Sequence, residues 1–386
     1  MNILDLPNEL LEYITSFLEV NAIVCLSKTC RRLHEISSIE SLWQALCQKD
    51  YNVNSSSGWN ITYRDIYTKV LKKCDFLGWK RLALLPYGGL VHVCWAEGEI
   101  QVNAYKPSHR EDAKQPFKRK QLFSIRWNRE LNVVEVYCMQ HRSGPKLSSL
   151  TQNGNYPLVQ CLDDHSHKSS RNQYKSNSKF PRGFLDHPDA FHGCNLITGS
   201  NLPLLPLSFP SRDEQAPIKL GLYTASYGPH GVEILNFMFK ENDPFVIEGL
   251  KISGDPNVPA GNVSVTIFLK KPMVLTLDDQ QSLDSLLEAD SRLTDASFQA
   301  LFNANSLNTD QRQPFSLPFQ VFDQFEALPN FCLARFAAEG RIAGHMFTTP
   351  SYCRCHFVKF SDTVFAVLWL ELYSFSMFYK AELPKL

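Results

Sequence analysis

The sequence predicts an α+β protein in which an N-terminal helical module precedes a mainly antiparallel, β-barrel-like domain. Apolar residues recur at helical spacing through residues 1–50. From residue 84 onward, short segments rich in β-branched and aromatic residues alternate with turns that contain Gly and Pro. We therefore expect a helical module at residues 1–50, a helical linker at 51–83 and a β-rich domain at 84–386.

The composition restricts the classes of partner. The chain of 386 residues is long enough for two or three domains, and its formal net charge is zero. A neutral chain has no overall attraction to nucleic acid or to an anionic membrane, and no apolar run approaches the roughly 20 residues that cross a bilayer. The 11 cysteines are scattered and odd in number, which favours a reducing compartment. We expect a cytoplasmic or nuclear protein, or one found in both, with neither nucleic acid nor membrane as a partner.

The helical module carries more apolar side chains than three short helices can bury against one another. Its first stripe begins at a Leu-Pro pair, and proline is tolerated in the first turn of a helix. The residues that define the pattern are Leu6, Pro7, Leu10, Leu11, Ile14, Leu26, Leu42 and Trp43. An apolar surface left exposed by such a module is available to a partner protein. The alternative is a helical cap that packs on this chain's own β domain.

The same residues closely resemble the F-box. In that family the Leu-Pro start, the leucines that follow it and the later Leu-Trp pair pack into a groove of the adaptor protein Skp1. The resemblance implies that the residues of the pattern bind Skp1 and, through it, a cullin-RING ubiquitin ligase.

The region after residue 84 predicts strands and turns. Residues 220–226 and 231–239 flank a turn, which indicates a hairpin, and residues 263–270 alternate with period two. A C-terminal meander is expected at 341–378. Two stretches do not fit a sheet: the amphipathic pattern at 283–302 predicts one or two helices, and residues 153–181 predict a long polar loop.

Several long runs in this β domain resemble one F-box family, that of F-box only protein 31. They are residues 85–90, 227–234, 252–261, 342–350 and 369–376. The resemblance implies a barrel-like domain that binds the C-terminal tails of substrate proteins, including cyclin-type tails and tails that end in an amide. It therefore implies a substrate-recognition subunit of an SCF (Skp1–cullin–F-box) ubiquitin ligase, which marks proteins for proteasomal degradation.

Asp255 is the first candidate for recognition of the chemical group at the C-terminal end of a substrate tail. A carboxylate accepts hydrogen bonds from an amide NH₂ group and repels a free carboxylate. The alternative is that Asp255 only caps backbone N–H groups in a turn. Tyr227, His230 and His345 are further candidates for substrate binding, because they lie in the same resembling runs. A lone histidine in such a turn is more often a structural hydrogen-bonding residue.

Glu371 is a different kind of candidate, because it interrupts a run of apolar neighbours that predicts a strand. A carboxylate in such a place must be paired, protonated or exposed to water. Arg341 is a possible partner. An ion pair that fixes the strand register explains this pattern as well as contact with a substrate does.

Cysteines and histidines around the long polar loop predict a structural zinc site. The candidate ligands are Cys138, His141, Cys161 and His167, a Cys₂His₂ set of the kind that zinc binds in closed sites. The resembling family carries a structural zinc in this region, but its histidine after a Gly-Pro pair falls on Lys146 here, so His141 would have to replace it. His165 is an alternative fourth ligand, and free thiols with surface histidines are the alternative to a metal. Cys353, Cys355 and His356 form a second, weaker candidate.

The sequence contains no motif that favours catalysis. It has no phosphate-binding Gly loop, no Gly-x-Ser-x-Gly elbow and no His-Glu-x-x-His helix. A receptor subunit needs none, because the E2 enzyme supplies the thioester chemistry and the receptor supplies proximity. We therefore expect a receptor without catalytic activity. Two other hypotheses remain: a β-barrel ligand sensor whose docking is controlled by a small molecule, and a hydrolase with an accessory helical module.

Overall fold

The computed structural model describes most of the chain, which divides into two compact units. The described residues are 3–107, 112–114, 116–141, 143–153, 156–162, 201–209, 216–227, 230–304, 312–321 and 328–383. The first unit comprises Met1–Trp79, His92–Asn103 and Gln121–Lys168. The second unit comprises Lys80–Val91, Ala104–Lys120 and Ser169–Leu386.

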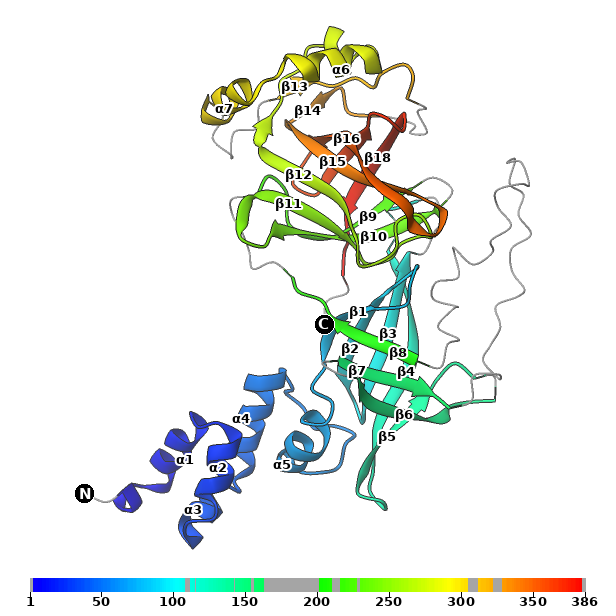
Figure 1. Cartoon of the computed structure of the whole chain (residues 1–386). Helices are drawn as coiled ribbons and strands as arrows, with labels where there is room; N and C mark the ends of the chain where they lie inside the picture. The colour runs from blue at the N-terminus through cyan, green and yellow to red at the C-terminus, as the bar shows by residue number, and fades with distance from the viewer. Residues whose placement is uncertain are drawn as a thin grey trace. The chain divides into compact units, whose positions relative to one another are not determined.

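The N-terminal part of the chain is helical, as predicted (Figure 1). Its elements are η1 (Ile3–Asp5), α1 (Asn8–Ser16), α2 (Val20–Leu26), α3 (Arg31–Ile36), α4 (Glu40–Tyr51), α5 (Tyr63–Asp65) and the π-helix η2 (Ile66–Leu71). Helix α4 ends at Asn52, whose left-handed backbone (φ 58°) is a common C-terminal cap. The indole N–H of the buried Trp43 donates to the carbonyl of Ser37 over 2.8 Å, which holds the start of α4 against the end of α3.

The first eight strands close into a barrel in which each strand pairs with the next (Figure 1). They are β1 (Gly78–Leu82), β2 (Leu90–Ala96), β3 (Glu99–Pro107), β4 (Phe117–Asn128), β5 (Val133–Cys138), β6 (Lys146–Asn153), β7 (Tyr156–Cys161) and β8 (Asn201–Pro206). The strand β1 begins at Gly78, inside the stretch that we predicted as a helical linker.

The second barrel lies wholly within the second unit. Its strands are β9 (Gly221–Ser226), β10 (Val232–Lys240), β11 (Asp243–Lys251), β12 (Val263–Pro272), β15 (Ala334–Gly344), β16 (Thr348–Lys359), β17 (Val364–Trp369) and β18 (Ser374–Lys380). All neighbours pair antiparallel, and β18 closes the barrel on β9. Aromatic rings dominate the interior, where Phe365 and Phe378 stack with 4.8 Å between their centroids. Burial of such large rings is a main source of barrel stability.

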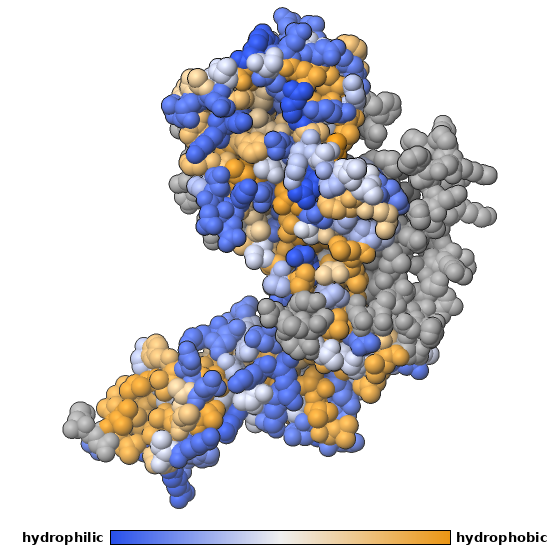
Figure 2. All heavy atoms as spheres, viewed as in Figure 1, coloured by the Kyte–Doolittle hydropathy of each residue, from blue (hydrophilic) through white to orange (hydrophobic). Residues whose placement is uncertain are grey.

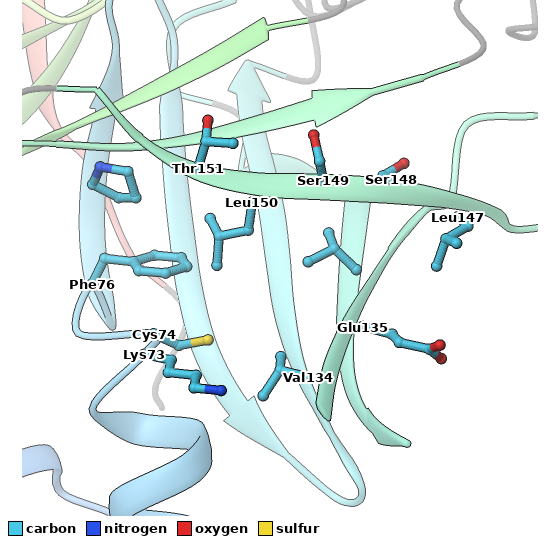
Figure 3. A pocket seen from close by; sticks show the side chains of 12 residues that line it. Lys73, Cys74, Phe76, Val134, Glu135, Leu147, Ser148, Ser149, Leu150 and Thr151 are labelled. Atoms are coloured by element: carbon cyan, nitrogen blue, oxygen red, sulfur yellow. The ribbon is translucent and has the colours of Figure 1, made fainter. Parts of the chain in front are cut away.

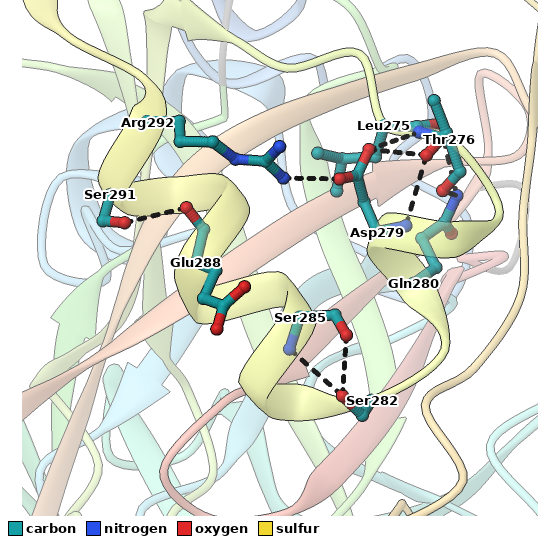
Figure 4. Close-up of polar contacts among 9 residues, drawn as sticks. All are labelled: Leu275, Thr276, Asp279, Gln280, Ser282, Ser285, Glu288, Ser291 and Arg292. Atoms are coloured by element: carbon teal, nitrogen blue, oxygen red, sulfur yellow. Dashed lines mark hydrogen bonds and ion pairs between the residues drawn. The ribbon is translucent and has the colours of Figure 1, made fainter.

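An insertion between β12 and β15 carries the predicted amphipathic helices. Its elements are η5 (Asp278–Gln280), α6 (Leu283–Arg292), α7 (Asp295–Ala304), β13 (Gln313–Pro314) and β14 (Phe331–Cys332). Ser282 caps α6, because its hydroxyl accepts the N–H of Ser285 over 3.1 Å. At the other end of the helix, the Arg292 guanidinium donates to Asp279 over 2.6 Å (Figure 4).

The structure confirms the predicted fold class and refines it. The hairpin predicted around residues 227–230 is β9–β10, and the helices predicted at 283–302 are α6 and α7. The sequence did not predict that the β region forms two barrels. Within the predicted C-terminal meander, residues 364–378 contain two strands, β17 and β18, which a turn separates. Among the described residues, no helix is long and apolar enough to cross a membrane.

Candidate functional site

Four of the runs singled out in the sequence meet within the second unit. They are residues 85–90, 227–234, 252–261 and 342–350. The backbone N–H of Gly254 donates to the carbonyl of Tyr87 over 2.9 Å, and that of Phe347 donates to the carbonyl of Pro256 over 2.9 Å. The loop 252–261 is therefore held by the turn at 85–90 on one side and by the β15–β16 hairpin on another.

Glycines permit this close packing. Gly88 has a positive φ of 64°, and a Cβ there would lie 2.4 Å from the carbonyl oxygen of Ile252. A Cβ on Gly254 would lie 2.3 Å from the amide nitrogen of Ala260. Both distances are far below a van der Waals contact, so any larger residue would push the segments apart. This explains in physical terms why these runs contain glycine.

A buried ion cluster of Glu233, Lys251 and Asp255 lies beneath the loop. Glu233 shares its face of β10 with Leu235, which belongs to the barrel core, and Lys251 pairs with Leu235 across the strands. The Lys251 Nζ atom lies 2.7 Å from Glu233 Oε2 and 2.7 Å from Asp255 Oδ2. All three side chains are almost fully buried, so their attraction is only weakly screened by solvent.

The ion cluster contains one cation for two carboxyl groups, and the two carboxyl groups respond differently. Burial raises the pKa of Glu233 well above its usual value, against the opposing effect of Lys251. Burial would also raise the pKa of Asp255, but Lys251 and hydrogen bonds hold it well below its usual value. Asp255 Oδ1 accepts the backbone N–H of Asn257 over 2.6 Å and that of Val258 over 3.0 Å. Asp255 thus caps a turn, which is the alternative that the sequence left open.

Tyr227 and His230 lie at the edge of the ion cluster. The Tyr227 ring centroid is 4.8 Å from Lys251 Nζ, a cation–π distance. The His230 Nδ1 atom is 3.9 Å from Asp255 Oδ1, and burial lowers the pKa of this histidine. The structure thus brings together three of the predicted substrate-binding residues.

The other two predicted residues are placed differently. His345 is exposed in the turn η6 (His345–Phe347), which contacts the loop through Phe347. Glu371 does not interrupt a strand: it lies in the exposed turn between β17 and β18. Its partner is Arg354, with 3.2 Å between Nε and Oε1, so the proposed pairing with Arg341 was wrong.

Three of the predicted metal ligands form a buried cluster in the first unit. The donor atoms of Cys138, His141 and Cys161 all lie within 4.8 Å of one another, and His141 Nε2 is 3.1 Å from Cys161 Sγ. Ligands of one tetrahedral zinc ion are separated by about 3.5–4 Å, as Zn–S and Zn–N bond lengths require. This triad could hold a metal ion. His165 and His167, the candidate fourth ligands, lie outside the described residues.

Strand register explains why the two cysteines meet. Val136 pairs with Ser148, and Ser148 pairs with Cys161, so these three side chains share one face of the sheet. Cys138 is two residues beyond Val136 and therefore faces the same side. In the second candidate cluster, Cys353 and Cys355 have sulfur atoms 3.8 Å apart, but His356 points away and contacts Asp290 over 2.9 Å.

A separate pocket of about 460 Å³ lies in the first unit, between the segment after η2 and strands β5 and β6. Cys74, Phe76, Val134 and Leu150 are among the side chains around it, and Lys73 and Glu135 also line it (Figure 3). Burial raises the pKa of the Cys74 thiol to about 12, so this cysteine is not a thiolate nucleophile at neutral pH.

The helical module exposes an apolar surface over α1 and α2, seen as orange atoms in Figure 2. The most exposed side chains are Tyr13 (64 %) and Phe17 (66 %), whose ring centroids are 4.8 Å apart. Leu10 and Ile14 share this exposure, and Leu6, Pro7 and Leu26 are exposed or half-buried.

Three residues of the predicted Skp1 contact are instead interior. Leu11, Leu42 and Trp43 are at most 2 % exposed, so they hold the helices together and cannot meet a partner in this conformation. All three belong to the F-box pattern, in which residues that hold the helices together and residues that contact a partner follow the same apolar spacing. Phe17 belongs to the first apolar stripe of the sequence, but neither it nor Tyr13 was among the residues predicted to bind Skp1.

Comparison with known proteins concerns both the helical module and the part of the chain that forms the second barrel. The family model "F-box-like" matches residues 3–49, and the model "Cyclin D1 binding domain" matches residues 206–385. F-box only protein 31 of Mus musculus is 27 % identical over 443 aligned residues, which cover 99 % of this chain and 85 % of the relative. The human protein of the same name is 26 % identical, with 99 % and 83 % covered. The chain is a homologue of F-box only protein 31. The resemblance to the F-box only protein 31 family is thereby confirmed, and it extends through the runs that meet at the loop 252–261.

Proposed function

We propose that this protein is the substrate-recognition subunit of an SCF ubiquitin ligase. The observation that carries the proposal is the presence in one chain of an F-box-like segment at 3–49 and of a cyclin D1 binding domain at 206–385. The first would recruit Skp1 and a cullin, and the second would hold the protein to be ubiquitinated. The receptor itself would be non-catalytic and would act in the cytoplasm, the nucleus or both.

Docking on Skp1 would use the exposed face of the helical module. Tyr13 and Phe17 are large aromatic side chains, which are common anchors of protein interfaces. Leu10 and Ile14 extend the same apolar surface. An exposed apolar surface of this kind indicates a partner.

Substrate capture would use the region around the loop 252–261. The proposed ligand is the C-terminal tail of a protein, including cyclin-type tails. Segments distant in sequence meet there, and the loop is fixed by the buried ion cluster and by close glycine contacts. A rigid loop reduces the conformational entropy lost when a flexible peptide binds.

The triad Cys138, His141 and Cys161 would hold a structural zinc ion. Two sulfur donors and one nitrogen donor are most of a Cys₂His₂ set, and all three residues are buried. The fourth ligand would be His165 or His167. The ion would fix the ends of β5 and β7.

Reconstitution tests the proposed function. We expect the full-length chain, assembled with Skp1, a cullin-RING module, E1, E2 and ubiquitin, to ubiquitinate cyclin D1. Removal of the cyclin C-terminal tail should abolish the product, whereas autoubiquitination of the receptor should persist. If the chain does not join the Skp1 complex, or if tailless cyclin is modified equally well, the proposal is wrong.

A ligand-sensing F-box protein is the second candidate. The pocket beside Cys74 favours it, because about 460 Å³ is within the usual size range for small-molecule sites. In that case a small molecule, rather than the tail alone, would set the affinity for substrate. A metabolite extract that changes cyclin ubiquitination by the purified complex would support this second function.

A further inference from the structure

The strands β5 and β6 pair along only part of their length. Residues 136–138 pair with residues 146–148 in the antiparallel register. Continuation of this register would place residues 133–135 opposite residues 149–151, but these two described segments form no backbone hydrogen bond with each other. Each segment pairs only on its other side, the first with β4 and the second with β7. The sheet of the first barrel is therefore open between residues 133–135 and residues 149–151.

The pocket of about 460 Å³ in the first unit lies at this opening, and Figure 3 shows Leu150 and Phe76 directed into it. Val134 also lines it, from the strand opposite Leu150. Val134 is half-buried, although it shares its face of β5 with the buried Val136. Leu150 is likewise half-buried, although its cross-strand partner Val159 is buried. Apolar side chains that face the barrel core are thus left accessible where β5 and β6 separate.

Apolar side chains are also exposed on the opposite face of the sheet, beside the opening. Val133 is 39 % exposed, and Leu147 is 55 % exposed. Leu147 pairs with Tyr137 across the strands, and Val133 lies on the same face of β5 as Tyr137, because alternate residues of a strand point the same way. Unpaired backbone groups flanked by apolar side chains are a template on which another strand can pair.

The residues that line the pocket include one cation and one carboxylate, Lys73 and Glu135. Glu135 accepts a hydrogen bond from the Tyr137 hydroxyl over 2.6 Å, and it lies opposite Arg126 of the neighbouring strand β4. Lys73 is exposed, and its ammonium group forms no hydrogen bond and no ion pair with another residue in the described part of the chain. An acidic side chain of a bound partner would therefore be favoured beside Lys73.

We propose that the opening between β5 and β6 binds an extended peptide segment of a partner protein, which adds a strand to the first barrel. The backbone of the peptide would form hydrogen bonds with residues 133–135 or 149–151, as in other complexes formed by strand addition. Its alternate apolar side chains would enter the pocket beside Leu150 and Phe76, and an acidic residue would pair with Lys73. A small apolar molecule would fill the pocket but would leave the backbone of both strands unpaired. The site shares no residue with the proposed tail site, which lies in the second unit.

Binding of a designed peptide to the full-length chain tests the inference. The probe alternates valine and threonine over about six residues, the usual length of a strand, with one glutamate at its centre. It is fused to the N-terminus of a fluorescent protein, so that it presents no C-terminal end to the tail site. We expect the probe to bind and to slow amide hydrogen exchange in residues 133–135 or 149–151. A probe with proline in place of each threonine keeps the valines but lacks the N–H groups that a strand needs, and it should not bind.

Variants of the chain locate the bound probe. Leu150→Asp should weaken binding at least about tenfold, because the apolar side chains of the probe would then meet a charge in the pocket. Leu162→Asp changes an exposed leucine of the same unit that does not line the pocket, and it should bind as wild type does. Lys73→Glu should reverse the charge preference, so that a probe with a central lysine binds better than the probe with glutamate. Lys72→Glu changes the neighbouring exposed lysine, which does not line the pocket, and should leave the preference unchanged.

The inference is overturned if the wild-type chain binds neither the glutamate probe nor the lysine probe, or if Leu150→Asp binds as tightly as Leu162→Asp. It is also overturned if the proline probe binds as well as the original, because the pocket would then take apolar groups without strand pairing, as expected of a small-molecule site. The proposed receptor function stands in each of these cases, since ubiquitination of cyclin is measured separately.

Discussion

Lys251 and Asp255 form a buried ion pair, with 2.7 Å between Nζ and Oδ2. Lys251 is also 2.7 Å from Glu233, so a single ammonium group contacts two carboxyl groups inside the second barrel. The pair joins the end of β11 to the loop that follows it. The position of the loop therefore depends on a charge balance in the interior as well as on packing.

Replacement of Lys251 by methionine should destabilise the second barrel severely. The variant keeps the approximate volume but leaves buried carboxyl groups without a cation, which typically costs about 3–5 kcal/mol. Lys240→Met is the matched control, because Lys240 is exposed in its pair with the partly buried Glu248, and ion pairs near the surface contribute about 0–1 kcal/mol. Urea unfolding followed by tryptophan fluorescence would measure both. Equal midpoints for the two variants would contradict a structural role of the ion cluster.

Glu233→Gln should stabilise the protein increasingly as the pH rises. Burial raises the folded-state pKa of Glu233, whereas unfolded glutamate titrates near about 4.3. The contribution of the protonated group is therefore fully present below about pH 4.3 and is lost as the pH rises through the folded-state value. Glutamine mimics the neutral form at every pH.

Thermal unfolding of wild type and Glu233→Gln between pH 4 and pH 8 would check this dependence. The difference in melting temperature should grow with pH in favour of the variant. Glu248→Gln, on the neighbouring strand β11 and partly exposed beside Lys240, is the control and should show no such trend. A difference that is constant or shrinks with pH would show that Glu233 is ionised in the folded state.

The sequence predicted local elements well, because their signals are local. The β9–β10 hairpin followed from apolar runs on either side of a turn, and α6 and α7 followed from helical spacing. The division into two barrels did not follow, since closure depends on pairings such as β1 with β8 and β9 with β18, which are distant in sequence. The periodicity of a strand does not predict which other strand will pair with it.

The candidate site was predicted only in part, because it too depends on contacts between segments that are distant in sequence. Asp255, Tyr227 and His230 lie in runs that were singled out, and the structure brings them together. Glu233 also lies in such a run but was read only as part of a strand, and Lys251 was not considered at all. Burial of an ion cluster is set by the barrel interior, which a single strand does not reveal.

The triad in the first unit should retain zinc in the purified protein. We expect about one zinc ion per chain by elemental analysis, as in closed sites with Cys and His ligands. Cys161→Ala should lose the metal and lower the melting temperature of the first unit, because metal binding stabilises the fold that brings the ligands together. Cys74→Ala removes another buried thiol of the same unit and should retain the metal. If Cys161→Ala retains about one zinc ion per chain, the ion binds at another site.

Phe17→Ser and Trp43→Ala should separate docking from folding in the helical module. The Phe17 side chain is 66 % exposed, so its removal leaves no cavity and should not reduce helicity measured by circular dichroism. It should nevertheless weaken capture of Skp1 strongly, because an aromatic anchor at an interface typically contributes about 2 kcal/mol or more. Trp43→Ala removes a buried ring that also donates to Ser37, and we expect a loss of about 3–5 kcal/mol and of helicity. Retention of Skp1 by Phe17→Ser at wild-type affinity would mean that the adaptor binds another face of the module.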